Sequence, residues 1–230
     1  MWTTSLVGEA PREVLQNAVG QGVSPDGSRV AYTTNQNREI WTVGPQGDDP
    51  QRVLTLGERE TVFRVVWAPN GGRLAYVCQK FRQTAGKIEG LGEIETCDLK
   101  GANRRVVVSD PELWDFTWVP QGKIVYTLGG GKGLWQIDVD RPKGSATNKP
   151  KRIINWAEFF ASGLNATADG KQLVFCKRRP LNPQVYVGDL EPGGSRLRSY
   201  TKLRLMMPAT GLFHGRTTAG RCSLRRRATA

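Results

Sequence analysis

Histidine is almost absent from this chain: a single one, His214, occurs in 230 residues. Imidazole-ligated metals and Ser/His/Asp hydrolysis both depend on histidine, so little room is left for either chemistry. The four cysteines contain no C-x-x-C pair, which argues against a zinc ribbon. From the sequence we therefore expect no catalytic residue, no metal ligand and no cofactor site.

Long apolar runs are missing as well. No stretch approaches the roughly 18 apolar residues that span a bilayer. The opening Met1-Trp2-Thr3-Thr4 has neither a basic region nor an apolar core, so it does not resemble a secretory signal. Hydrophobic residues still make up 38% of the chain, which is enough for the core of one domain. The 27 glycines and 13 prolines indicate many turns and favour an all-β fold over a helical one.

Acidic residues disappear near the end of the chain, and this explains much of the net charge of +12. Residues 206–230 hold five arginines and no acid, and the first 205 residues carry only +7. A strongly basic stripe would indicate nucleic-acid binding. Because the excess over the first 205 residues is mild and scattered, we expect no nucleic-acid partner.

One hairpin pattern occurs four times. An apolar run, a corner similar to Pro-Asp-Gly, a basic residue and a second apolar run make up residues 22–32, 65–76, 116–126 and 164–175. The corner glycines, 44, 51 and 48 residues apart, are Gly27, Gly71, Gly122 and Gly170. Proline presets φ, aspartate bonds the backbone two residues on, and glycine takes a positive φ. Each copy therefore predicts a β-hairpin.

Two more strands are expected after each hairpin. Third strands are predicted at 39–43, 93–99, 133–139 and 184–190, and fourth strands at 52–55, 104–108 and 151–154. Four short antiparallel strands in about 45 residues are typical of a propeller blade. A β-sandwich also uses strands at this spacing, but it need not repeat its turn chemistry. We predict an all-β fold, a partial β-propeller of about four to five four-stranded blades.

The Ser-Pro-Asp-Gly-Ser-Arg-Val-Ala-Tyr stretch at 24–32, followed by Glu-Ile-Trp-Thr-Val at 39–43, resembles the WD40-like PD40 repeat of TolB-type propellers. The resemblance covers residues 1–205. It departs at Gln121, where the pattern has aspartate, and at Ala168, where it has proline. Such repeats build the periplasmic Tol-system propeller. They also build propellers attached to bacterial Ser/Thr kinases and winged-helix regulators, and those of prolyl-oligopeptidase-type peptidases.

The repeat is expected to be incomplete at both ends. Residues 2–6 and 11–15 match a third and a fourth strand, and no first hairpin precedes them. This predicts a fragment of a larger bacterial protein, with Met1 as a possible internal start. Because an open arc exposes strand edges, self-association is expected to be possible. The compartment is left open, since the parent protein could be membrane-anchored or periplasmic.

Residues 206–230 depart from the repeat. One interpretation is a basic, disordered tail for an acidic partner. The other is a reading-frame error. When the gene is read in a frame that begins at the third base of the Met206 codon, the codons permit Asp-Ala and, later, Trp-Thr-Xxx-Asp-Ser-Arg. That aspartate would fall near position 217, about 48 residues after Asp169. We hypothesise that 206–230 is out of frame and poorly structured, and we assign no role to His214, Cys222 or the terminal arginines.

Two sets of side chains in the propeller region are candidate sites. Four tryptophans recur at equivalent strand positions: Trp41, Trp67, Trp118 and Trp135. Either a platform that stacks a ligand or packing between blades explains them, and packing is favoured. Buried free thiols are the expected state of the three cysteines on or beside predicted strands, although two of them could meet across a sheet; they are Cys78, Cys97 and Cys176. Free thiols weakly favour a reducing compartment.

Other candidates are better explained by ordinary structure. Turn hydrogen bonding, rather than a cation site, is expected of Asp26, Asp98, Asp138, Asp169 and Asp189. The glycine-rich loop 128–133 lacks the Walker spacing and is expected to be a hairpin turn. The sequon at Asn165 falls in a predicted strand. A solvated loop is favoured for the basic group 177–180, Arg196 and Arg198.

The sequence thus predicts a non-catalytic propeller segment for protein–protein interaction or ligand sensing within a larger bacterial protein, with a protein or peptide partner. Two alternatives stay open by resemblance: a substrate-gating propeller of a prolyl-oligopeptidase-like serine peptidase, and a Tol-like periplasmic scaffold. The peptidase would need a Gly-x-Ser-x-Gly nucleophile motif and a downstream histidine outside these residues. The DNA flanking the gene separates the three.

Overall fold

The computed structural model describes residues 1–4, 10–84, 86–140, 142–154, 160–178, 184–190 and 197–202. These residues form strands and turns, and no helix occurs among them. It follows that no helix in this part of the chain is long and apolar enough to cross a membrane. The proposed tail, 206–230, lies outside the described residues.

Four antiparallel four-stranded sheets account for most of the structure. Blade 1 contains β3 (Val19–Val23), β4 (Val30–Thr34), β5 (Glu39–Val43) and β6 (Gln51–Thr55). Blade 2 contains β7 (Glu60–Trp67), β8 (Arg73–Thr84), β9 (Lys87–Asp98) and β10 (Arg105–Asp110). Blade 3 contains β11 (Leu113–Val119), β12 (Lys123–Leu128), β13 (Leu134–Asp138) and β14 (Lys151–Ile154). Blade 4 contains β15 (Phe160–Ala166), β16 (Gln172–Arg178), β17 (Gln184–Leu190) and β18 (Leu197–Lys202).

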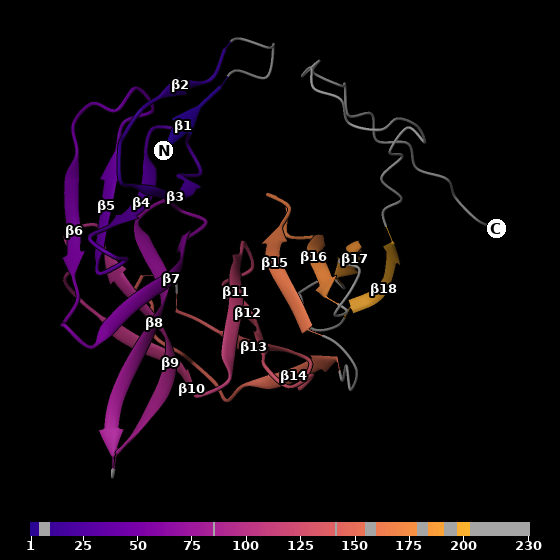
Figure 1. The fold of residues 1–230 in the computed structure, drawn as a ribbon. Coiled ribbons are helices and arrows are strands. Elements are labelled where there is room, and N and C mark those ends of the chain that lie inside the picture. Colours follow the sequence, from indigo (N-terminus) through magenta and orange to yellow (C-terminus); the bar gives the residue numbers. More distant parts are fainter. Residues whose placement is uncertain are drawn as a thin grey trace, which may run out of the picture.

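The blades follow one another around an arc, with indigo blade 1 at one end and orange blade 4 at the other (Figure 1). Within each blade, successive strands pair as neighbours, and the first strands of adjacent blades pack against each other. A separate two-stranded pair joins β1 (Trp2–Thr3) to β2 (Arg12–Glu13). The predicted all-β partial propeller is confirmed.

The corner glycines explain why the repeat folds as hairpins. All four have positive φ, between 66° and 77°, as the corner requires: Gly27, Gly71, Gly122 and Gly170. The preceding acid or amide caps the turn, as when Asp26 Oδ1 accepts a bond from the Ser28 amide at 3.1 Å. Gln121 departs from this pattern, because its side-chain nitrogen donates instead to the carbonyl of Asp169 in the next blade.

The core lies between the sheets rather than inside any one of them. Alternate residues of a strand point to opposite faces, so a central strand serves two interfaces. In β8, Leu74 and Tyr76 belong to the cluster shared with blade 1, whereas Ala75 and Val77 belong to the cluster shared with blade 3. A third cluster, which includes Phe175, joins blades 3 and 4. Face-to-face burial of this kind makes each blade depend on its neighbours.

Blade 2 departs from the predicted repeat through its long second and third strands. Strands β8 and β9 have 12 residues each, and they stay paired from Arg73↔Asp98 to Thr84↔Lys87. Their far ends extend past β7 and β10 as a two-stranded projection (Figure 1). We call residues 80–91 the hairpin arm. The repeat pattern predicts no structure for this segment. Polar and apolar residues nevertheless alternate, as in strands, on either side of Gly86, in Lys80-Phe81-Arg82 and in Lys87-Ile88-Glu89.

Candidate interaction surface

The first strand of each blade carries an exposed or half-exposed side chain eight residues before its corner glycine. Val19, Phe63 and Trp114 occupy this position in blades 1 to 3 and are 54%, 60% and 53% exposed. In blades 2 and 3 the position is a β-bulge, where one extra residue interrupts the pairing with the second strand. A bulge turns its side chain out of the regular alternation, and this places large apolar groups in solvent.

The hairpin arm lies at the same end of the blades. In an antiparallel sheet, the turn from second to third strand lies beside the start of the first strand, opposite the corner. Phe81 and Ile88, 37% and 75% exposed, share one face of the arm, because Phe81 pairs with Gly90 and Gln83 with Ile88. Five of the eight large hydrophobic side chains exposed among the described residues thus lie at this end. We call this set the mouth surface: Val19, Phe63, Phe81, Ile88 and Trp114.

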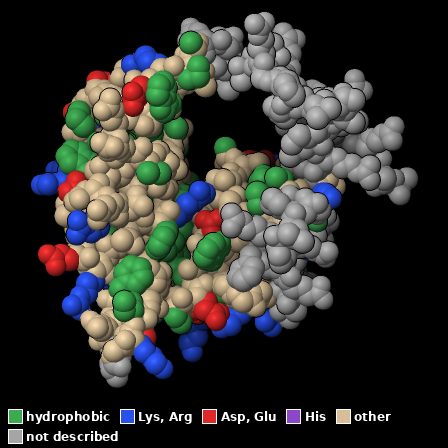
Figure 2. Space-filling model, in the orientation of Figure 1, with side chains coloured by type: hydrophobic (Ala, Val, Ile, Leu, Met, Phe, Trp, Pro, Cys, Tyr) green, Lys and Arg blue, Asp and Glu red, His purple; other side chains and the backbone are tan. Residues whose placement is uncertain are grey.

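Figure 2 views the molecule from the side shown in Figure 1. Hydrophobic side chains are distributed over the visible face among scattered basic and acidic ones. Exposed apolar side chains that gather at one end of a fold, and that are rimmed by polar groups, are typical of interaction sites. The mouth surface is therefore the candidate site that the fold presents.

Two charged side chains, Arg64 and Asp115, connect the first strands of blades 2, 3 and 4. The Oδ2 atom of Asp115 accepts a bond from the Leu164 amide at 3.0 Å, and Oδ1 lies 3.6 Å from Arg64 Nε. Arg64 in turn donates from Nη2 to the Leu164 carbonyl at 2.8 Å and to Asn165 Oδ1 at 3.3 Å. Blades 2, 3 and 4 are thereby joined through two side chains. Sequence reasoning did not single out Arg64 or Asp115, because the motif does not include them.

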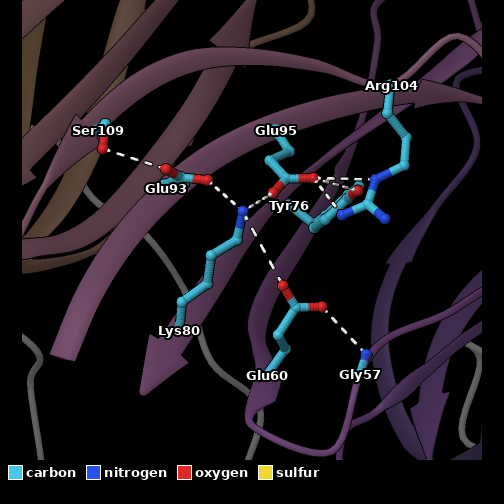
Figure 3. A network of polar contacts seen from close by, with 8 residues as sticks. All are labelled: Gly57, Glu60, Tyr76, Lys80, Glu93, Glu95, Arg104 and Ser109. Atoms are coloured by element: carbon cyan, nitrogen blue, oxygen red, sulfur yellow. Dashed lines mark hydrogen bonds and ion pairs between the residues drawn. The ribbon is translucent and has the colours of Figure 1, made fainter. Parts of the chain in front are cut away.

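A second polar network supports the base of the hairpin arm (Figure 3). Glu95 on β9 is only 2% exposed, and its carboxylate accepts bonds from Tyr76 Oη at 2.8 Å and from Arg104 Nη2 at 2.6 Å. Lys80 Nζ lies 3.0 Å from the other Glu95 oxygen and also contacts Glu93. Lys80 Nζ also lies 3.9 Å from one carboxylate oxygen of Glu60, and the other Glu60 oxygen accepts a hydrogen bond from the backbone amide of Gly57.

The electrostatics of this network indicate a structural role. Burial alone raises the pKa of Glu95, but hydrogen bonds from Arg104, Lys80 and Tyr76 outweigh burial, and the pKa lies below its usual value. Burial lowers the pKa of Lys80, and the bonds to Glu93 and Glu95 more than reverse this. Burial and the neighbouring Glu95 raise the pKa of Tyr76. Each group is held in its ordinary charge state, so the network is suited to anchoring the arm.

The tryptophans occupy two different positions rather than one, which corrects the expectation from the sequence. Trp67 is the last residue of its first strand and Trp118 the last but one of its own, and both are buried between blades. Trp41 and Trp135 lie half-buried in the third strands, each beneath a guanidinium of the neighbouring fourth strand. Trp135 packs against the core cluster between blades 2 and 3.

The three cysteines are free thiols in the structure. Cys78 and Cys97 are buried in blade 2, and burial raises the pKa of each to about 12. Cys176 in blade 4 is half-buried. Thiols with such a high pKa are unreactive at neutral pH, so Cys78 and Cys97 serve as small core residues.

The acids considered as a cation site are separated among turns. Asp26, Asp98 and Asp169 each accept bonds from nearby turn amides. Asp138 pairs with Lys123, and Asp189 accepts a bond from Gln172. Within the described ranges, no group of three or more His, Cys, Asp or Glu side chains could hold a metal ion.

The remaining candidates lie in separate places. The glycine-rich loop links β12 to β13, and Gly129 N donates to the Glu112 carbonyl. Asn165 lies on β15. Lys177 lies on β16, with its Nζ 5.9 Å from the centre of the Tyr186 ring. Residues 179–180, Arg196, His214 and Cys222 fall outside the described residues, as does the side chain of Arg198.

Comparison with known proteins supports the sequence resemblance. No family model matches the chain. The Tol-Pal system protein TolB of Bordetella pertussis is 27% identical over 173 residues, covering 72% of this chain and 36% of TolB. The structure of TolB from Acinetobacter baumannii gives a TM-score of 0.54 at 22% identity, covering 82% of this chain and 41% of that one.

A peptidase has a similar fold. The acylaminoacyl peptidase of Pyrococcus horikoshii gives a TM-score of 0.55 at 14% identity, covering 82% of this chain and 32% of the peptidase. At that identity only the fold is shared. The chain spans about a third of the length of the curated relatives it matches. The predicted resemblance to TolB-type propellers is confirmed: the chain is a four-blade stretch of β-propeller similar to TolB in sequence and in fold.

Proposed function

We propose that this chain is a non-catalytic interaction module that binds a protein or peptide partner at the mouth surface. The observation that carries the proposal is the position of five exposed large hydrophobic side chains at the same end of the blades, on first strands and on the projecting arm. Aromatic residues are favoured at the centre of protein interfaces, because they bury large areas with little loss of rotamer entropy. Phe63 and Trp114 are the proposed anchors of the interface.

The state of the polar groups supports a binding role over a catalytic one. Catalytic acids and bases are typically held with a pKa near the working pH. The buried Glu95 instead has a lowered pKa and makes bonds to Tyr76, Lys80 and Arg104. Arg64 and Asp115 likewise make contacts between blades.

The similarity to TolB indicates where to look for the partner. The Bordetella relatives are proteins of the Tol-Pal system. We propose a component of such a system, from the organism that encodes this chain, as the first partner to test. A propeller that gates a hydrolase is the second possibility, and the same experiment distinguishes it.

A site-specific photocrosslinker tests the proposal. It is placed in the full-length gene product at Phe63, at Trp114 and, as a control, at Val106, which is 52% exposed on an outer strand. The expected result is one shared protein partner captured from both mouth positions and not from Val106. Crosslinks only to a hydrolase domain of the same polypeptide would assign the gating role. Equal capture from Val106, or no capture from either mouth position, would overturn the proposal.

A further inference from the structure

The outer edge of the hairpin arm, on β9, is an open strand edge. Among the described residues, β10 pairs with β9 only as far as Asp110↔Gly92. The arm continues beyond that point as a projection of β8 and β9 (Figure 1). The β9 residues nearest its tip are Lys87, Ile88 and Glu89, and all three are exposed, Ile88 by 75%. An exposed strand edge is a template on which a further strand can pair.

The backbone of Ile88 directs its hydrogen-bonding groups toward this edge. The Phe81 N–H donates to the Arg59 carbonyl at 2.9 Å, so the polar backbone groups of Phe81 point away from β9. Phe81 lies opposite Gly90, and in an antiparallel ladder two opposite residues either bond each other or both point outward. The backbone groups of Gly90 therefore point away from β8, and those of Ile88, two residues earlier, do the same. Ile88 can thus exchange two hydrogen bonds with a strand added at this edge.

The side chains around Ile88 are complementary to themselves. When two copies of Lys87-Ile88-Glu89 run antiparallel with the two isoleucines opposite, each Lys87 lies opposite Glu89 of the second copy. Each Lys–Glu pair is then a non-hydrogen-bonded pair, in which opposite side chains lie closest. Arg82 already lies opposite Glu89 within the arm, so each Glu89 carboxylate would stand between two cations.

Other registers lack this match. A pair centred on Lys87 or on Glu89 places like charges opposite each other. A shift of one residue in either direction places Ile88 opposite a charged side chain, and it moves the two isoleucines to opposite faces of the sheet. On the other edge of the arm, Lys80-Phe81-Arg82-Gln83 contains no acid to match its basic residues. The sequence around Ile88 therefore selects one edge and one register.

We propose that two copies of this chain associate through the β9 edges of their hairpin arms, as an antiparallel strand pair centred on Ile88. Both copies use the same patch, so the contact closes as a two-fold symmetric dimer. The contact uses Ile88 from the mouth surface but neither Phe63 nor Trp114. It goes beyond the proposed function and does not depend on it. Because the paired edge is short, the interface is small and the dimer is weak and dependent on concentration.

Sedimentation velocity of the full chain over a wide range of concentration tests the proposal. The unmodified chain is expected to shift from monomer to dimer as the concentration rises. Lys87→Glu and Glu89→Lys each place like charges opposite each other, and each alone should weaken the dimer about tenfold. The matched control is Lys151→Glu, which reverses an exposed lysine on β14 and should dimerise as the unmodified chain does.

Two rescue experiments make the test specific for this register. An equal mixture of the two single variants should dimerise again, because one copy then carries acids at positions 87 and 89 and the other carries lysines. The Lys87→Glu, Glu89→Lys double variant should also dimerise by itself, since the exchange keeps opposite charges facing each other. A chain that stays monomeric at every concentration would overturn the proposal, as would failure of either rescue. Association that the single variants leave unchanged would place the contact on another surface, such as a blade face, and would overturn it as well.

Discussion

The carboxylate of Asp115 in blade 3 accepts a hydrogen bond from the backbone amide of Leu164 in blade 4, 49 residues further along the chain. Its other oxygen faces the Arg64 guanidinium of blade 2. One buried side chain therefore contacts both neighbouring blades. This relationship indicates where the stability of the arc is concentrated.

Removal of the Asp115 carboxylate should destabilise the protein strongly. Asp115→Ala leaves the Leu164 amide without its acceptor and removes the carboxylate that pairs with the Arg64 guanidinium, and the expected loss is about 2–4 kcal/mol of unfolding free energy. Asp115→Asn keeps one oxygen acceptor and should lose about half as much. Urea denaturation of the two variants checks this order, and equal losses would contradict it.

Glu95 should control the stability of blade 2. Glu95→Gln removes the charge that Tyr76, Lys80 and Arg104 share, and we expect a loss of about 3 kcal/mol at pH 7 because one partner of a buried ion pair is removed. Glu93→Gln, at the more exposed end of the network, is the matched control and should cost less. Thermal or urea unfolding measures both.

The same network predicts acid sensitivity. Because the pKa of Glu95 is lowered in the folded state, its contribution to stability is present above about pH 4.5, the ordinary value, and is lost as the pH falls through the lowered one. Asp26, with a pKa lowered to about 2 by bonds from Ser24 and Ser28, should act in the same direction. Stability measured from pH 6 to pH 2 should therefore decrease, and the decrease should be smaller in Glu95→Gln. An identical pH dependence would argue against the role of Glu95.

Two glycines with similar φ should respond differently to alanine. Gly27 has φ of 75°, and a Cβ added there would meet open space, so Gly27→Ala should cost only the backbone strain, about 1–2 kcal/mol. Gly101 has φ of 73°, and a Cβ there would clash with the Val53 carbonyl oxygen of blade 1. Gly101→Ala should therefore cost about 1–3 kcal/mol more than Gly27→Ala. Denaturation midpoints of the two variants test the difference.

The equivalent tryptophans Trp67 and Trp118 should differ in what they contribute to the stability of the fold. Trp67→Phe removes the hydrogen bond from Trp67 Nε1 to the Gly22 carbonyl, which joins blades 1 and 2. We therefore expect the unfolding free energy to fall by about 1 kcal/mol or more. Trp118→Phe removes a donor that has no partner among the described residues and should cost less. Comparison of unfolding free energies decides this, and a greater loss at Trp118 would be the contrary result.

Short-range sequence signals were enough to define the blade. Proline, aspartate and glycine act within four residues, so the corner at 24–27 and its copies could be recognised without any distant contact. Alternating apolar residues around each corner then defined the strands. The bounds 184–190 and 151–154 were predicted as the structure has them, because turn residues mark both ends.

The side chains that meet between blades could be identified only in the folded arrangement. Arg64, Asp115 and Leu164 come together because the first strands of three blades pack side by side, and no local pattern specifies that contact. The exposure of Phe63 and Trp114 depends on bulges, which arise from pairing register rather than from composition. Trp67 Nε1 donates to a carbonyl of the neighbouring blade, whereas Trp118 Nε1 has no hydrogen-bond partner among the described residues, although both tryptophans stand two residues before a corner proline. Turn chemistry is local, whereas packing and hydrogen-bond partners depend on residues about 50 positions away in the chain.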